Sequence, residues 1–207
     1  MKSRYLIATV LASGLAVFNA NKANAVEGSA ELILGNNSST LDIKLSEDFT
    51  KIFGFFGRNI AKVDHKNQVS NFTIVDITMK GYKGLASVAE FQYDQDIGLV
   101  PRLGAEYYFE RGNFNLFLLA TAGIKEGDIQ IVTNLQYTPR IVDKKQIFGN
   151  LEAVTGLSKN GHDYSIQKIR LGLKMDSNIL GIGLELNEDG NEGEISYNLG
   201  PFYLRKF

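Results

Sequence analysis

Few side chains in this 207-residue chain belong to the types that usually perform covalent or metal chemistry. It has no cysteine and two histidines, His65 and His162. The absence of cysteine excludes disulfides, thiolate-bound zinc, iron–sulfur clusters and thiol nucleophiles. Ser165 follows His162 by three residues, which brings a base and a nucleophile of the hydrolase kind close together in sequence. Because a histidine in a polar hairpin is usually just solvated, we predict no catalytic residues and no enzyme activity.

One acidic segment has the spacing of a calcium loop. It begins at Glu185 and continues through Asn187, Asp189 and Gly190. Such a loop normally starts with Asp and ends with a twelfth-position Glu, whereas this segment starts with Glu185 and has Ser196 at that place. On either side of this segment, apolar and polar residues also alternate as they do in strands. We interpret it as an acidic hairpin turn and expect no metal and no cofactor.

The other ionisable side chains are numerous but balanced. There are 22 basic and 23 acidic residues, which gives a formal net charge of −1. This balance excludes a nucleic-acid binder that works by bulk positive charge. A hydrophobic content of 44% with 22% charged residues is typical of a folded chain rather than a disordered one. The elements that position these charges therefore carry the functional information.

The N-terminal segment has the three parts of a secretory signal peptide. It begins with two cations, continues with 14 mostly apolar residues at 5–18 and ends in the small-residue site Ala23-Asn24-Ala25. The apolar run is shorter than the roughly 20 residues that span a bilayer as a helix. We predict a cleaved signal at 1–25 and a single domain at 26–207.

Beyond the signal, apolar and polar side chains alternate in almost every segment. Ile169 and Leu171, for example, face one side of their strand, whereas Lys168 and Arg170 face the other. Eleven turn signals, such as Arg111-Gly112-Asn113, separate these segments. The pattern predicts about twelve strands joined by short turns, with no helix and no second domain.

A meander of antiparallel strands must protect its edges, and closure into a barrel does so. We therefore predict an all-β fold, a single closed antiparallel up-and-down transmembrane β-barrel of 10 to 12 strands. Alternation by itself fits two environments, because a soluble barrel turns its apolar face inward and a membrane barrel turns it outward. A soluble periplasmic barrel that binds an apolar ligand is the alternative.

Three features favour a membrane barrel over a soluble one. First, Ile195, Tyr197, Leu199, Tyr203 and Phe207 share one face, and the sequence ends on Phe. Second, about twelve strands supply more apolar side chains than a small interior would hold. Third, Tyr and Phe are placed near predicted strand ends, as in the aromatic girdles of membrane barrels: Tyr82, Tyr93, Phe109, Tyr137, Phe148 and Tyr203.

The last strand resembles the closing strand of bacterial outer-membrane β-barrels, although Pro201 and Arg205 on the same face depart from that pattern. The resemblance covers residues 26–207. It implies a place in the bacterial outer membrane, with the lipid bilayer and the outer-membrane assembly machinery as partners and no nucleic acid. It also implies that Tyr203 and Phe207 form the C-terminal assembly signal.

In a membrane barrel the polar face lines the interior. The predicted pore-lining or lumen network consists of Glu90, Arg102, Glu106, Glu152, Lys168, Arg170, Lys174 and Glu185. The mixed signs fit internal ion pairs that stiffen the wall, and they also fit a narrow aqueous pore with a slight cation preference. The three cations at 168, 170 and 174 form a cluster of one sign, which we expect to pair with Glu152 and Glu185 on neighbouring strands.

These observations predict a small passive pore or a structural membrane protein. A less favoured alternative is an outer-membrane lipid hydrolase. Barrel phospholipases, by resemblance, place a His and a Ser close together on the outer rim with an Asn that orients the His. Here neither His65 nor His162 is followed by the expected His-x-Ser-Asn spacing.

Overall fold

The computed structural model describes residues 26–142, 145–190 and 193–207. The expected signal peptide at 1–25 lies outside the described residues. Within the described ranges the chain forms thirteen strands and no helix. No helix long and apolar enough to cross a membrane is therefore found in this part of the chain.

Twelve long strands and one short one follow each other along the chain. They are β1 (Glu27–Leu34), β2 (Ser38–Asp48), β3 (Phe53–Asp64), β4 (Val69–Lys80), β5 (Leu85–Asp94), β6 (Gly98–Arg111), β7 (Phe114–Gly123), β8 (Ile129–Tyr137), β9 (Arg140–Val142), β10 (Lys145–Ser158), β11 (Gly161–Met175), β12 (Asn178–Asp189) and β13 (Ile195–Lys206).

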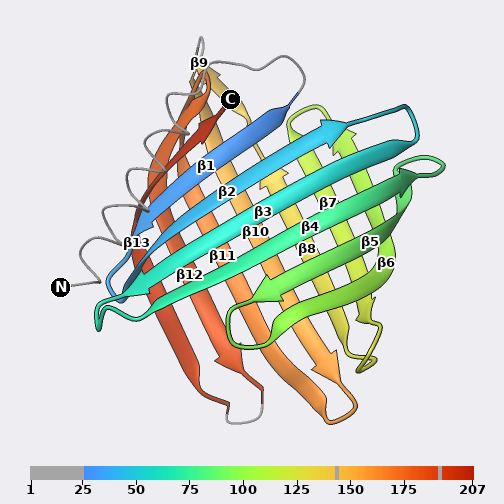
Figure 1. Cartoon of the computed structure of the whole chain (residues 1–207). Helices are drawn as coiled ribbons and strands as arrows, with labels where there is room; N and C mark the ends of the chain where they lie inside the picture. Colours follow the sequence, from blue (N-terminus) through green and yellow to red (C-terminus); the bar gives the residue numbers. More distant parts are fainter. Residues whose placement is uncertain (1–25, 143–144, 191–192) are drawn as a thin grey trace.

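The sheet closes on itself. Each long strand pairs antiparallel with its neighbours along the chain, β10 pairs with both β8 and β11, and β13 pairs with β1. The short strand β9 pairs with β10 alone and lies outside this closed circuit. Figure 1 shows the strongly tilted strands wrapping around a central space. The prediction of a closed antiparallel barrel of about twelve strands is confirmed.

Tight turns join the strands at both ends of the barrel. The turn between β6 and β7 contains Gly112 at φ 62°, a left-handed conformation that glycine adopts without a steric penalty. The turn between β11 and β12 contains Asp176 at φ 53°, and short polar side chains of this kind tolerate that region better than most. Because the turns are short, nearly all of the described chain belongs to the wall.

The two faces of the wall point in the directions that a membrane barrel requires. Leu171 and Ile182 are 62% and 63% exposed, respectively, on the outside. Glu90 and Glu152, in contrast, are 1% and 3% exposed and point inward. A soluble barrel would show the reverse arrangement, so the structure does not support that alternative.

Part of the interior is apolar. Ile33, Phe148, Ile179 and Phe202 form a buried cluster, and the rings of Phe148 and Phe202 lie 6.2 Å apart. The expectation that Phe148 belongs to an outer aromatic girdle is wrong, because Phe148 is 2% exposed and has the same parity as the inward Glu152. A residue near a strand end therefore still points to the side of the wall that the alternation along its strand dictates.

Candidate functional site

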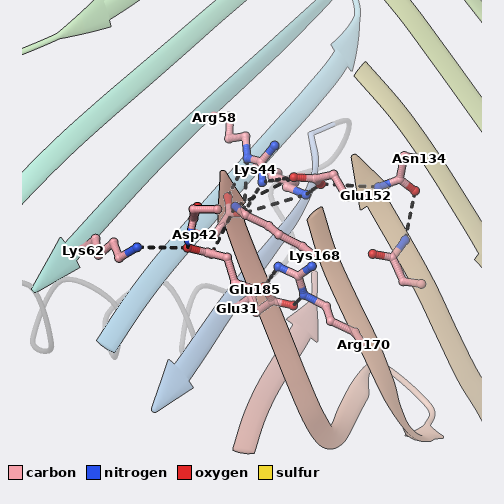
Figure 2. Close-up of polar contacts among 12 residues, drawn as sticks. Glu31, Asp42, Lys44, Arg58, Lys62, Asn134, Glu152, Lys168, Arg170 and Glu185 are labelled. Atoms are coloured by element: carbon pink, nitrogen blue, oxygen red, sulfur yellow. Dashed lines mark hydrogen bonds and ion pairs between the residues drawn. The ribbon is translucent and has the colours of Figure 1, made fainter. Parts of the chain in front are cut away.

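The charged residues of the wall meet inside the barrel, because closure turns every second side chain of each strand toward a common space, the lumen. Figure 2 shows acidic and basic side chains of several strands converging there. We call this set the ion-pair network. It comprises Glu31 on β1, Asp42 and Lys44 on β2, Arg58 and Lys62 on β3, Glu152 on β10, Lys168 and Arg170 on β11, and Glu185 on β12.

Glu152 is the centre of the ion-pair network. Its Oε1 accepts a hydrogen bond of 2.8 Å from Arg58 Nη2, and its Oε2 accepts one of 3.3 Å from Lys44 Nζ. Lys168 Nζ lies 3.9 Å from Oε1, and Asn134 Nδ2 donates to Oε2 at 3.4 Å. One buried carboxylate therefore balances cations from β2, β3 and β11.

Arg58 joins this centre to a second buried acid. Its Nε lies 3.0 Å from Asp42 Oδ1 and its Nη2 lies 2.5 Å from Oδ2, so the guanidinium holds Asp42 with two donors. The same Nη2 reaches Glu152. A planar guanidinium suits such bridging because its donors are fixed in a fork.

Lys168 lies between two acids of neighbouring strands. It is in direct register with Glu152 on β10 and with Glu185 on β12, and its Nζ lies 3.9 Å from both carboxylates. Lys62 donates to Glu185 at 2.9 Å from the other side. These are the acidic partners that the sequence predicts for the cationic cluster of β11.

Arg170 has a different partner from the expected ones. Its Nε and Nη2 donate to the two oxygens of Glu31 on β1, each at 2.5 Å. The inward position opposite Arg170 on β12 is Gly183, where even a Cβ would lie 3.9 Å from Arg170 Cγ. The missing side chain of Gly183 leaves the path across the lumen open.

A second polar group lies on the other side of the lumen. Arg102 Nε donates to Thr121 Oγ1 at 2.9 Å and lies 3.4 Å from Glu90 Oε1, and its Nη1 also pairs with Asp128. Arg102 is 3% exposed, so all of its charge is balanced within the protein.

Hydrogen-bonded side chains extend this second group across the barrel. Gln92 Nε2 donates to Glu90 at 3.0 Å and to Gln130 Oε1 at 2.5 Å, and Gln130 Nε2 donates to the Tyr164 hydroxyl at 2.7 Å. The chain of contacts runs from β5 through β8 to β11. It narrows the lumen but leaves an open space beside it.

That space is a cavity of about 940 Å³. Its lining runs from Glu27 and Asp48, near the end of the barrel where β1 begins, to Asp94 and Ile97 at the opposite end. Acidic and basic side chains of the network face it along the way, including Lys44, Arg58, Lys62 and Lys168. The cavity therefore extends along the lumen.

The predicted lumen residues fall into two groups. Five of them line the cavity: Glu90, Glu106, Glu152, Lys168 and Glu185. Arg102 and Arg170 are buried in ion pairs within the wall, and Lys174 lies half-buried near the end of β11; none of these three is part of the cavity lining.

Five members of the ion-pair network are not among the predicted lumen residues: Glu31, Asp42, Lys44, Arg58 and Lys62. In β3 the inward positions read Gly54, Phe56, Arg58, Ile60 and Lys62, so apolar residues interrupt the polar face. The signal that the sequence offered was the alternation along β3, which puts Arg58 and Lys62 on the same face of the strand. This alternation identifies the two residues as lumen residues only when the neighbouring strands show which face of β3 points inward.

His162 and Ser165 do meet. His162 Nε2 lies 2.8 Å from Ser165 Oγ, and a register shift where β10 faces residues 162–164 brings the two onto one side of β11. Because Tyr164 lines the cavity, Ser165 points outward, where its hydroxyl also lies 3.3 Å from that of Thr155. Among the described residues no acid or amide bonds to the ring to orient it, as a triad requires. The described residues also hold no group of three or more His, Asp or Glu that suits a metal ion.

No protein-family model and no curated protein matches the chain. Its fold is similar to that of the KdgM porin, with a TM-score of 0.53 and 14% identity over 87% of this chain and 99% of that one. The KdgM porin in complex with disordered oligogalacturonate gives a TM-score of 0.52 and 12% identity over the same shares. Pseudomonas aeruginosa OpdL gives a TM-score of 0.43 and 13% identity, over 83% of this chain and 66% of that one.

The closed wall, its apolar outer face and its charged interior define a transmembrane β-barrel of the outer-membrane class. Within that class the chain has the fold of the KdgM porin over nearly the whole length of both proteins.

Proposed function

We propose that this barrel is a passive channel for small polar solutes in the outer membrane of a Gram-negative bacterium. The observation that carries the proposal is the cavity of about 940 Å³, whose lining includes residues from both ends of the barrel. Charged side chains along such a path replace part of the hydration of a passing solute. The porin fold of the structural neighbours supports the same role.

The filled part of the lumen limits the size of the solute. The apolar cluster around Phe148 and Phe202 fills the side formed by β10, β12, β13 and β1, and the ion-pair network extends from β10 to β12 and β1 to the facing strands β2 and β3. The remaining path is lined by residues of β2 to β8 and β10 to β12, and the expected conductance is small compared with that of wide porins.

Planar lipid bilayers test the proposal directly. We expect the refolded barrel to give small stepwise conductance in potassium chloride. Leu119→Trp should reduce it, because Leu119 lines the cavity, whereas Leu118→Trp should leave it unchanged, because Leu118 is an exposed residue of the outer face. Heat-dependent migration on a gel checks that each variant is folded.

A silent bilayer with a folded barrel would overturn the channel and leave a structural role for the protein. Equal conductance in the two Trp variants would also contradict the assignment of the path. The comparison is matched because the same substitution is made at adjacent residues of β7 that face opposite sides of the wall.

A further inference from the structure

Among the residues that the structure describes, one buried acid of the lumen has a carboxylate oxygen without a hydrogen-bond partner. Asp76 on β4 is 4% exposed, and its Oδ1 receives no hydrogen bond. Every other buried acid of the lumen described above is held by a guanidinium, an ammonium group or side-chain donors. Burying an uncompensated carboxylate is strongly unfavourable, so Asp76 either loses its charge by binding a proton or is stabilised by a counter-charge that a bound cation supplies.

The nearest charged groups do not supply it. Glu90 is in direct register with Asp76 on β5, and Glu106 on β6 also lines the cavity; both are acidic. Arg58 on β3 already bonds to Asp42 and Glu152. The wall thus presents a local excess of negative charge.

Two further cations near this wall are also engaged. Lys80, at the end of β4, pairs with Asp48, and Arg102 on β6 pairs with Glu90 and Asp128. Movement of either toward Asp76 would break these pairs. Among the described residues, the inward-facing cations of β3 to β6 are therefore all engaged elsewhere.

The acidic wall borders the lumen. Asp76, Glu90 and Glu106 all line the 940 Å³ cavity, and Phe56 and Ile74 line it beside them. Phe56 is the direct register partner of Asp76 on β3. A carboxylate next to an aromatic ring and aliphatic side chains is the environment in which proteins bind organic ammonium ions, through charge and cation–π attraction.

We propose that Asp76, together with Glu90, Glu106 and Phe56, forms a binding site for a cationic solute that carries an ammonium group with apolar substituents. The inference deepens the proposed function by naming a solute class, and it rests on the channel for the route by which that solute passes.

Calorimetric titration of the folded barrel in detergent micelles with choline chloride tests the site without conduction. We expect binding to the wild-type barrel, at least tenfold weaker binding to Asp76→Asn, and unchanged binding to Asp94→Asn. Asp94 also lines the cavity, but its carboxylate accepts turn N–H groups, including that of Asp96 at 2.8 Å. If Asp76→Asn fails to fold, Glu106→Gln provides the second variant and should also weaken binding.

Three results would overturn the site: no choline binding to the wild type, equal binding to Asp76→Asn, or equally strong competition by sodium chloride, which would show a bare monovalent cation site. A silent bilayer combined with choline binding would reject the channel and leave the site. Conduction without binding would reject the site and leave the channel, so the two failures are distinguishable.

Discussion

The guanidinium of Arg170 on β11 holds the carboxylate of Glu31 on β1 through two hydrogen bonds of 2.5 Å, although β12 and β13 lie between these strands. The two residues are 139 positions apart in sequence and are 4% and 5% exposed. The pair therefore bridges the region where the first and last strands close the barrel, and each charge depends on the other for compensation.

Arg170→Met should destabilise the barrel strongly. Removing one partner of a buried ion pair leaves the other charge uncompensated, at a cost of about 3–5 kcal/mol. The double variant Glu31→Gln with Arg170→Met should recover most of that loss, because no lone charge remains. Urea unfolding in lipid vesicles measures both. A double variant as unstable as the single one would show that the loss comes from packing.

Glu152→Gln should change the charge selectivity of the channel. Glu152 compensates Arg58, Lys44 and Lys168, all of which line the cavity, so its neutralisation leaves an excess of positive charge there. We expect the reversal potential in a salt gradient to shift toward anions.

The control for that shift is Glu194→Gln, which removes the same charge from an exposed site outside the cavity lining. It should leave the reversal potential unchanged. An equal shift in both variants would mean that selectivity follows the total charge of the barrel rather than the ion-pair network.

Ile182→Arg should impair insertion into membranes. Ile182 lies near the middle of β12 and is 63% exposed on the outer face. An arginine at the middle of the lipid-facing surface costs about 2–4 kcal/mol, falling toward the interfaces. Asn187→Arg, which adds the same side chain to the cavity lining of the same strand, should insert normally. Folding yield into vesicles measures the difference, and equal yields would contradict the assigned faces.

Most of the fold prediction was based on the alternation of apolar and polar residues along each segment. It placed Lys168 and Arg170 on one face and Ile169 and Leu171 on the other, and a closed wall can bury charges only on its inner side. Strand closure followed from the need to protect edges, since no other element was available to cover them. The membrane orientation required the C-terminal pattern as well.

The partners inside the lumen were less predictable. Lys168 pairs with Glu152 and Glu185 because they are register neighbours, which adjacent strands reveal. Arg170 pairs with Glu31 across two strands, and this depends on the shear of the closed barrel and on the space at Gly183. Neither the shear of the barrel nor the space at Gly183 can be derived from the alternation of a single segment.

Loss of the terminal aromatic ring should slow assembly of the barrel. Phe207 exchanges two backbone hydrogen bonds of 2.9 Å with Gly28 of β1, and its ring covers Gly28 so closely that a Cβ there would overlap it. The residue thus completes the contact between the last and first strands, and we propose that the assembly machinery reads it together with Tyr203. Phe207→Ala should lower the rate of folding in the presence of that machinery, whereas Phe207→Tyr keeps the ring and should fold at the wild-type rate. The appearance of the heat-sensitive gel form over time measures this rate. Equal rates for the Ala variant and the wild type would show that β13 is recognised by other residues.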